Sequence, residues 1–162
     1  MRRLLILLLT AGLLPATAAE LGKADRIVIL KQQRELRLMR GQELLKSYPI
    51  ALGPHPKGPK RQLGDGRTPE GYYVIDARTG NTPYHLALHI SYPNQMDRKS
   101  ADEAHLRPGG EIWIHGMPRS YGHWDPVRFY RDWTDGCIAV GNLAIEEIAR
   151  AADNGTIVEI RP

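Results

Sequence analysis

Proline and glycine interrupt the middle of this chain so often that the segments between them are short. The 162 residues include 12 prolines and 16 glycines, a density that points to many turns and short strands. Residues 53–60 (GPHPKGPK) cannot form regular structure, so we expect a surface loop there with His55 as a solvated side chain. The length suits one domain with its own core. We therefore expect a single domain made mostly of β-strands.

Several segments alternate apolar and polar residues or are rich in β-branched and aromatic side chains, which favours strands. These segments are 25–30, 34–39, 44–52, 72–75, 84–90, 111–115 and 156–160. The first three predict an antiparallel meander, and Pro49 places the third at a sheet edge. The strictly alternating segment 84–90 predicts one face with Tyr84, Leu86, Leu88 and Ile90 and another with His85, Ala87 and His89.

Two short helices are compatible with the remaining pattern. The polar segment 95–107 predicts a short helix around residues 100–105. Asn142 is a candidate N-cap for a helix from about residue 143 to 152, and Gly155 a candidate for its left-handed end. Its expected apolar stripe consists of Leu143, Ile145, Ile148 and Ala152. The expected fold class is mostly β (α+β), with one or two short helices.

The first nineteen residues have the three parts of a secretory signal peptide. Arg2 and Arg3 precede an apolar stretch over residues 4–14, and Ala18 and Ala19 offer small residues for cleavage. The apolar stretch is shorter than the roughly 20 residues that span a bilayer, which disfavours the alternative of an uncleaved anchor. We expect a signal peptide over 1–19, one domain over 20–162, and a periplasmic or cell-wall location. Contact with the membrane is expected during export alone.

The charge pattern argues against a nucleic-acid partner. The chain has 22 Lys and Arg against 18 Asp and Glu, and losing Arg2 and Arg3 with the signal peptide leaves 20 against 18, a net charge of +2. The sequence also has no run of basic residues with interleaved aromatic residues that would bind the phosphate backbone of a nucleic acid.

Cys137 is the single cysteine of the chain. An unpaired cysteine in an exported protein indicates intermolecular pairing or a reactive thiol, whereas a buried cysteine can also pack as a small hydrophobe. Gly136 precedes it and lets backbone N–H groups approach a bound carbonyl oxygen, as an oxyanion hole requires. We interpret Cys137 as a nucleophile.

A cysteine nucleophile needs a base, and His115 is the best candidate. It ends the predicted strand 111–115 and is followed by Gly116. His123 is the alternative, but it belongs to the long segment 117–133, which we expect to be irregular.

Other chemistry fits the residues less well. His85 and His89 would lie about 13 Å apart on a strand at ~3.3 Å per residue, too far for one metal, and structural zinc sites usually need several cysteines. We expect no metal and no cofactor. No Gly-x-Ser-x-Gly elbow of a serine hydrolase is present.

The combination of Ile114-His115-Gly116 with Thr134-Asp135-Gly136-Cys137-Ile138, upstream of Asn142, resembles the L,D-transpeptidase catalytic domain of bacterial cell-wall enzymes. Thr68-Pro69-Glu70-Gly71 and Ser91-Tyr92-Pro93-Asn94 are similar to further family segments. The resemblance covers roughly residues 26–160.

This resemblance implies a β-sandwich-like fold and cysteine chemistry on peptidoglycan stem peptides. Cys137 would attack the carbonyl before a D-residue and form a thioester, which the amine of another stem or of a lipoprotein lysine resolves. His115 would be the base, its ring held by a backbone carbonyl near Gly116, with the N–H groups of Gly136 and Cys137 as oxyanion donors. Candidate substrate contacts are Tyr92, Arg128, Arg131, Trp133, Thr134 and Asp135.

Two positions depart from the family pattern. Asp135 stands where the family usually has another residue type, and Ala139 replaces an arginine suited to a substrate carboxylate. Arg119, Arg128 or Arg131 are possible substitutes, since guanidinium groups pair with carboxylates bidentately. Three alternatives stay open: hydrolysis of the same substrates as a carboxypeptidase, a non-catalytic peptidoglycan-binding module, and a metal-dependent peptidase.

Overall fold

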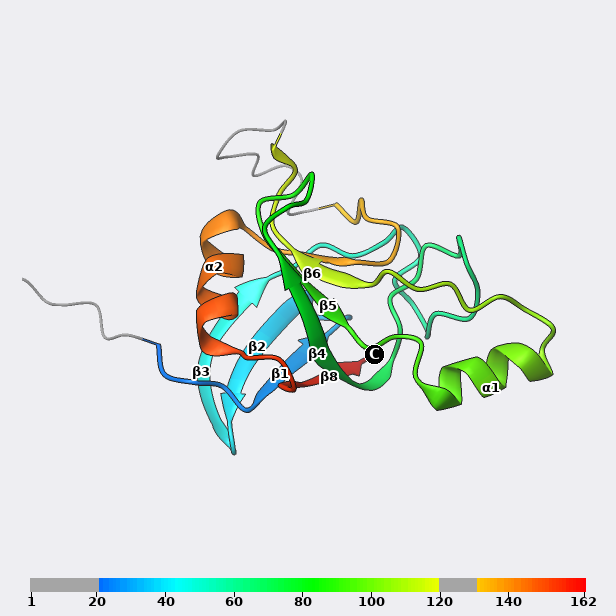
Figure 1. Ribbon diagram of the computed structural model, residues 1–162, viewed down its shortest axis with the longest axis horizontal. Helices are drawn as coiled ribbons and strands as arrows, with labels where there is room; N and C mark the ends of the chain where they lie inside the picture. The colour runs from blue at the N-terminus through cyan, green and yellow to red at the C-terminus, as the bar shows by residue number, and fades with distance from the viewer. Residues whose placement is uncertain (1–20, 120–130) are drawn as a thin grey trace, which may run out of the picture.

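The computed structural model describes residues 21–119 and 131–162, and the fold within them is mostly β with two helices (Figure 1). The elements follow in the order β1 (Arg26–Leu30), β2 (Glu35–Arg40), β3 (Glu43–Pro49), β4 (Gly71–Thr79), β5 (Ala87–Ile90), α1 (Gln95–Glu103), β6 (Trp113–His115), β7 (Ile138–Ala139), α2 (Asn142–Ala151) and β8 (Ile157–Arg161). The expected fold class is therefore confirmed. The expected signal peptide lies outside the described residues. Among the described residues, no helix is long and apolar enough to cross a bilayer.

The strands form one sheet in the order β3-β2-β1-β8-β4-β5-β6-β7. The meander predicted for β1, β2 and β3 is confirmed, with β3 at the edge. Strand β8 enters the middle of the sheet, parallel to β1 and antiparallel to β4. Because the two ends of the described chain pair with each other, the centre of the sheet is built from residues far apart in sequence.

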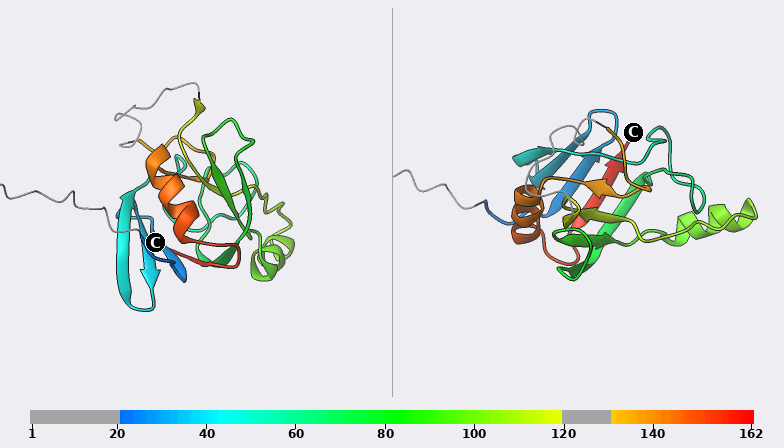
Figure 2. Two further views of the ribbon diagram at one scale, coloured as in Figure 1. Left: turned by 60° about the vertical axis from the view of Figure 1, so that its left-hand side comes forward. Right: turned by 90° about the horizontal axis from the view of Figure 1, so that it is seen from above.

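The sheet curls because β4 belongs to two layers. Its first half, Gly71–Val74, pairs with β8, and its second half, from Ile75, pairs with β5 after an irregularity in the register. Beyond β3, Ala51 exchanges two backbone hydrogen bonds of 2.9 Å with Ala139 in β7. The chain that follows one edge strand thus reaches the opposite edge, and the curled sheet encloses a core (Figure 2).

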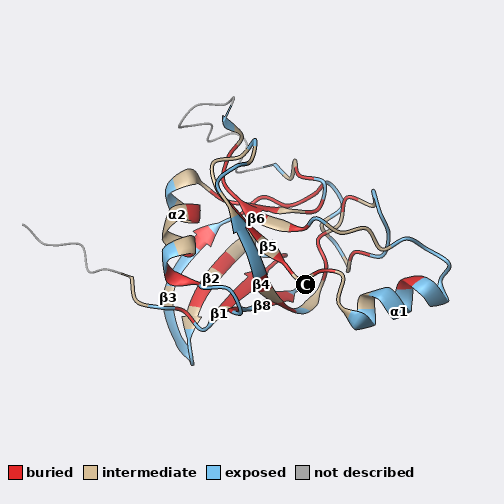
Figure 3. Cartoon of the chain, viewed as in Figure 1, coloured by how far each residue is buried: buried red, intermediate tan, exposed pale blue. Residues whose placement is uncertain are grey.

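Helix α2 covers one opening of the curled sheet and is bound to it by buried side chains (Figure 1). Ile145, Ile148 and Ala151 are fully buried in the core, whereas Leu143, which we expected in the apolar stripe, is 78% exposed. The burial pattern in Figure 3 shows the same contrast between the inner and outer faces of α2.

Both predicted caps of α2 are wrong in detail. Gly141 is the N-cap, without a side-chain hydrogen bond, because the Asn142 side chain instead accepts a 2.8 Å hydrogen bond from the backbone N–H of Met117. The helix ends at Ala152 in an extended conformation. Gly155 does have a positive φ of 89°, but it uses it in the turn that leads into β8, where Thr156 N–H donates to Asp153.

Helix α1 begins five residues before the segment in which we expected it. Asn94 caps it by accepting hydrogen bonds from Met96 and Asp97, and the Asp97 carboxylate accepts from the Asn94 backbone, a capping box. Ala101 is its buried residue, so the helix lies mostly exposed beside the body (Figure 3). A helix without an apolar stripe gives little periodicity to predict from, which explains the misplaced start.

The segment 84–90 is shorter as a strand than its alternation predicted. Pairing starts at Ala87, opposite His115, while Tyr84 makes an isolated bridge to Pro118. Leu88 and Ile90 share one face as expected, and that face is the core, since neither has any exposed surface. Tyr84 does not share that face, because its ring stacks on His115.

The irregular loop predicted around residues 53–60 extends to residue 70 and is held by two charged groups, of which Lys31 is buried and Asp65 partly buried. The Lys31 ammonium, at the end of β1, donates to the carbonyls of Gly58 (2.7 Å) and Thr68 (2.9 Å) and to Glu70 (2.8 Å). The Asp65 carboxylate accepts from Lys60 at 2.8 Å and from three backbone N–H groups. These contacts fix the loop beside the cysteine segment.

Candidate active site

His115 and Cys137 lie on neighbouring parallel strands. His115 in β6 is the register partner of Ala139 in β7, and Cys137 precedes β7 directly. Side chains two residues apart on a strand share a face, so Cys137 and His115 point to the same side, about 8 Å apart at Cα for strands ~4.8 Å apart with ~3.3 Å per residue. The sequence placed these two residues 22 positions apart, and the sheet brings them together.

The His115 ring is buried and held on three sides. Its Nδ1 donates to the carbonyl of Gly116 at 2.7 Å, so in the neutral ring Nε2 carries the free lone pair. Tyr84 stacks on the ring at 4.0 Å between centroids, and Trp133 meets it edge-on at 5.7 Å. Burial lowers the pKa of His115, and the Gly116 contact opposes this only in part. The imidazole is therefore fixed in orientation and neutral near pH 7.

Gly116 owes its place to close packing. A Cβ at this position would lie 2.7 Å from the Asn142 side-chain oxygen and 3.0 Å from His85. A larger residue would therefore displace the Gly116 carbonyl from the His115 ring. The Gly116 N–H donates to Leu86 at 3.0 Å. Gly116 thus supplies a carbonyl that orients the histidine and has no N–H free for an oxyanion.

Cys137 is partly exposed, and its thiol donates weakly to the carbonyl of Glu111 at 3.4 Å. Burial raises the pKa of the Cys137 thiol; the backbone N–H of Trp113 opposes the shift, and the charges of Asp135 and Glu111 add to it. No hydrogen bond joins the thiol to His115, although both residues are described. The resting pair is accordingly a neutral thiol beside a neutral imidazole, not a preformed thiolate and imidazolium.

The Thr134 hydroxyl makes two hydrogen bonds within the loop that precedes Cys137. Thr134 Oγ1 donates to the Cys137 carbonyl at 2.8 Å and accepts from the Gly136 N–H at 3.2 Å. Thr68 from the facing loop donates to the Gly136 carbonyl at 2.9 Å. Thr134, expected to touch substrate, is buried and satisfied by its own loop. Gly136, expected as an oxyanion donor, has its N–H engaged.

The Cys137 N–H remains the available donor of the expected oxyanion pair. Among the described residues it has no hydrogen-bond partner. Gly136 keeps a structural reason to be glycine, because its φ is +119° and a Cβ would lie 2.4 Å from the Arg67 carbonyl oxygen.

A partly buried ion pair anchors the cysteine segment to the sheet. The Arg34 guanidinium, in the turn between β1 and β2, forms a bidentate pair with the Asp132 carboxylate, its Nε lying 2.9 Å from Oδ1. The same carboxylate accepts from Leu52 N–H at 2.9 Å, and Leu52 in turn accepts from Thr134 N–H at 3.0 Å. Residues 132–134 are therefore held from two sides just before the nucleophile candidate.

The other expected substrate contacts have different outcomes. Tyr92 belongs to the core: it is 3% exposed, and its hydroxyl donates to the Pro108 carbonyl, so its assignment to substrate binding is corrected. Asp135 and Arg131 are exposed, and Asp135 is near enough to Cys137 to raise the pKa of its thiol. Trp133 packs against His115. Arg128 and the alternative base His123 lie outside the described residues.

The replacement of the family arginine by Arg119, Arg128 or Arg131 stays a prediction, and Arg128 lies outside the described residues. Ala139 is fully buried, and the Arg119 guanidinium donates to the Gly80 carbonyl at 2.7 Å. The histidines considered for a metal take separate carboxylate partners, His85 with Glu146 at 2.6 Å and His89 with Asp76 at 2.5 Å. Within residues 21–119 and 131–162 no group of three or more potential metal ligands clusters.

Three features of the site escaped sequence reasoning. Tyr84 was assigned to the same strand face as Leu88, but its ring stacks on His115. Arg34 was assigned to a half-exposed strand, but it anchors the cysteine segment. Glu111 was assigned to the start of a strand, and its carbonyl accepts the hydrogen bond from the thiol. No local pattern distinguishes these residues, because each acts through a contact with a distant segment.

Comparison with known proteins identifies the family. The model of the L,D-transpeptidase catalytic domain (YkuD) matches residues 24–160. The chain belongs to this L,D-transpeptidase family. The curated relative YafK of Escherichia coli K12, a candidate L,D-transpeptidase, is 32% identical over 134 residues, which cover 79% of this chain and 47% of YafK. The chain thus spans about half the length of the curated relatives it matches.

Solved structures agree with this assignment to the L,D-transpeptidase family. The helical cell shape determining protein Pgp2 from Campylobacter jejuni is 28% identical, with a TM-score of 0.64 over 90% of this chain and 51% of Pgp2. An L,D-transpeptidase from Mycobacterium smegmatis shares the fold at 15% identity, with a TM-score of 0.55 over 84% of this chain and 58% of that protein. The family and fold expected from the sequence are both confirmed.

Proposed function

We propose that this protein is an exported cysteine acyltransferase that acts on the stem peptides of peptidoglycan through a thioester on Cys137. The observation that carries the proposal is the juxtaposition of Cys137 with an imidazole whose tautomer is set by Gly116. Membership of the L,D-transpeptidase family supports the substrate class. YafK and Pgp2 bear names tied to L,D-transpeptidation and cell shape, which favours a role in cell-wall biogenesis.

The chemistry begins with proton transfer. His115 Nε2 takes the thiol proton as Cys137 Sγ attacks the carbonyl carbon that precedes a D-residue, typically diaminopimelate before D-alanine. The Cys137 N–H donates to the oxygen as it gains charge. When the tetrahedral intermediate collapses, the C–N bond breaks, and His115 returns the proton to the leaving amine. A thioester remains on Cys137.

The second half of the reaction decides between transfer and hydrolysis. His115 takes a proton from an incoming nucleophile, which attacks the thioester and releases the thiol. An amine from another stem or from a lipoprotein lysine gives a cross-link, whereas water gives a carboxypeptidase. We propose transfer as the main outcome. Hydrolysis is the second candidate, because Ala139 stands where the family has an arginine that would hold the substrate in the usual pose.

Product analysis tests the proposal. Purified protein is incubated with stem tetrapeptides and with digested sacculi, and products are identified by mass spectrometry. We expect released D-alanine and a Cys137 thioester, or a carbapenem adduct on Cys137. Cys137→Ala should abolish D-alanine release, the thioester and the carbapenem adduct. Cys137→Ser, which keeps the size of the side chain, is the control. Turnover by Cys137→Ala equal to wild type would falsify the mechanism. Sedimentation with sacculi without turnover by the wild type would instead indicate a binding module.

Export is part of the same proposal, since peptidoglycan lies outside the inner membrane. The pattern over residues 1–19 supports it. N-terminal sequencing of the protein from a periplasmic extract should find a chain that starts at Ala19 or Glu20. A mature chain that still begins at Met1, in the cytosolic fraction, contradicts export.

A further inference from the structure

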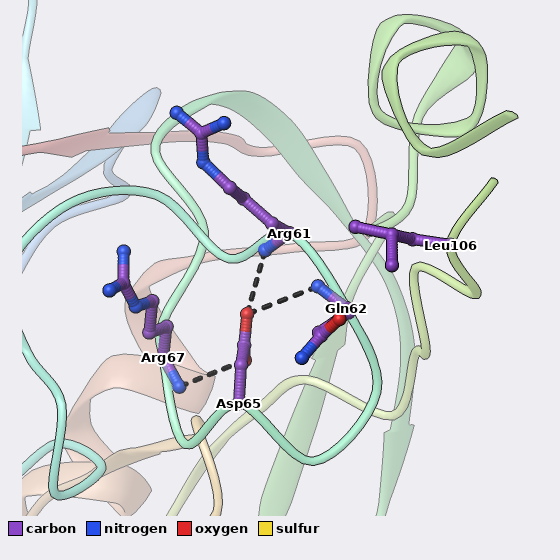
Figure 4. A pocket seen from close by; sticks show the side chains of 5 residues that line it. All are labelled: Arg61, Gln62, Asp65, Arg67 and Leu106. Atoms are coloured by element: carbon purple, nitrogen blue, oxygen red, sulfur yellow. Dashed lines mark hydrogen bonds between the residues drawn. The ribbon is translucent and has the colours of Figure 1, made fainter. Parts of the chain in front are cut away.

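A pocket of about 450 Å³ lies in the loop between β3 and β4, outside the residues assigned to catalysis (Figure 4). It is lined by Arg61, Gln62, Asp65, Arg67 and Leu106. The backbone N–H of Leu63 donates to the Arg107 carbonyl at 2.7 Å, so the wall contributed by Leu106 is attached to the loop. The pocket is therefore built from two segments that are hydrogen-bonded to each other.

The pocket is positively charged. The Asp65 carboxylate accepts from Lys60 and from the backbone N–H groups of Arg61, Gln62 and Arg67, and these hydrogen bonds lower the pKa of Asp65 against the effect of its burial. Its charge is thus neutralised inside the loop. Among the described residues, neither the Arg61 nor the Arg67 guanidinium has a carboxylate partner. In Figure 4 both side chains leave the loop toward the same side of the view.

The loop that forms the pocket touches the nucleophile segment. The Arg67 carbonyl oxygen packs so closely on Gly136 that a Cβ there would lie 2.4 Å away, and the next residue, Thr68, donates to the Gly136 carbonyl. The Lys60 ammonium is near enough to favour the Cys137 thiolate. The pocket loop and the cysteine segment are therefore joined by one close backbone contact and by the short, buried side chain of Thr68.

We propose that this pocket binds a carboxylate of the peptidoglycan stem peptide through Arg61 and Arg67, and so takes over the role of the arginine that Ala139 replaces. The inference rests on the proposed function and adds the substrate group that holds the stem in place. A guanidinium group pairs with a carboxylate bidentately, and Arg61 and Arg67 both line the pocket. Gln62 and Leu106 offer the pocket an amide and an apolar wall, which suit a short peptide better than a bare inorganic anion.

Binding to a catalytically inactive protein tests this inference apart from turnover. Calorimetry measures the affinity of Cys137→Ala for a stem tetrapeptide, and Arg61→Gln and Arg67→Gln are introduced separately into that background. We expect each to weaken binding about 10- to 100-fold, as loss of a charged hydrogen bond does. Arg98→Gln, an exposed arginine on α1, is the matched control and should bind like the parent. Arg61→Lys should restore part of the affinity.

Chemical changes in the peptide identify the carboxylate without any mutation. Peptides amidated at the C-terminal carboxylate, at the glutamate carboxylate or at the diaminopimelate carboxylate are compared, and inorganic phosphate is added as a competitor. Amidation of one of the three carboxylates should weaken binding to the parent protein as much as the arginine substitutions do. The arginine substitutions should then not weaken the binding of that amidated peptide further. Equal binding of all peptides, binding unaffected by Arg61→Gln and Arg67→Gln, or no binding of any stem overturns the inference. Competition by phosphate as strong as by the peptide also overturns it.

The outcomes separate this inference from the proposed function. If the arginine variants lose affinity but the wild type forms no thioester, the pocket stands and the catalytic proposal fails. If the wild type turns over stems and the arginine variants do so with unchanged KM, the catalytic proposal stands and the pocket assignment fails.

Discussion

The proposed chemistry depends on two neighbouring residues, His115 and Cys137, whose charged forms are both disfavoured. Burial lowers the pKa of His115 and raises that of Cys137, because a partly desolvated site disfavours either charged form. Asp135 adds to the shift at the thiol. A thiol in this setting reacts when a base removes its proton during attack, in contrast to cysteines that exist as thiolates at rest. The orientation of His115 by Gly116, Tyr84 and Trp133 is therefore as important as its presence.

The directions of these pKa shifts predict the pH dependence of the proposed reaction. The base is lost as pH falls through the lowered pKa of His115, so the acid limb of kcat/KM should lie below the ordinary imidazole value of 6.5. Thiolate accumulates only above the ordinary thiol value of 9.0. Alkylation of Cys137 by iodoacetamide, followed by mass spectrometry, should therefore accelerate up to high pH.

Asp135→Asn serves as the matched variant in this experiment. Removal of the negative charge should move the alkylation midpoint to lower pH, since Asp135 raises the pKa of the thiol. An alkylation midpoint below pH 7 in the wild type would show a resting ion pair and contradict the neutral description.

At the scale of elements, the loop over residues 53–70 connects the sheet to the cysteine segment. Lys31 holds it from β1, and Thr68 and Arg67 press it against Gly136. The Lys31 side chain is 2% exposed and the Glu70 side chain 18% exposed, and burial lowers the pKa of Lys31 despite the pairing. The buried Lys31 ammonium donates to three acceptors on this loop and so fixes the loop to the sheet.

Removal of this ammonium should destabilise the protein strongly. Lys31→Ala leaves the Glu70 carboxylate and two carbonyls without their donor, and breaking a buried pair from one side costs about 3–5 kcal/mol. Urea unfolding measured by circular dichroism gives the change in free energy of unfolding. Lys23→Ala, whose pair with Asp153 is 64% and 63% exposed, should change little. Equal changes in the free energy of unfolding for the two variants would mean that Lys31 does not stabilise the loop.

At the scale of the whole molecule, the fold is closed by contacts between the ends of the described chain and between the edges of the sheet. Strand β8 lies between β1 and β4, and Val158 and Ile160 contribute 0% and 2% exposed side chains to the core. The sheet cannot reach from the β3 side to the β5 side without β8. Helix α2 and the bridge between Ala51 and Ala139 then close the remaining openings.

Truncation tests the dependence on β8. Removal of residues 156–162 should abolish cooperative folding, because it leaves β1 and β4 with unpaired edges inside the sheet. Loss of the dispersed methyl signals in an NMR spectrum and of a cooperative thermal transition would show it. Removal of the exposed Pro162 alone should leave both unchanged. A truncated protein that unfolds cooperatively near the wild-type temperature contradicts the central role of β8.

Prediction from sequence succeeded where residues bury a face with a regular period. Strand β1 is a continuous apolar run that is buried from Ile27 to Leu30, strand β2 alternates between buried and more exposed residues, and the core face of α2 was found through Ile145 and Ile148. It failed where an element is exposed or short: α1 has one buried residue, and Tyr84 lies outside β5 despite its alternating neighbours. Caps were missed when a side chain such as Asn142 bonds to a remote N–H and not to its own helix.

The amino-acid sequence by itself determined the mostly β fold class and nominated His115 and Cys137, because periodicity and a solitary cysteine are local properties. The tertiary structure decided which groups surround them: Tyr84 and Trp133 on the ring, Arg34 on Asp132, and the arginine pocket beside Gly136. These contacts depend on the curl of the sheet and on the loop after β3, which unite distant segments. Contacts of that kind leave no periodic trace in the sequence, since each residue is selected by a neighbour far along the chain.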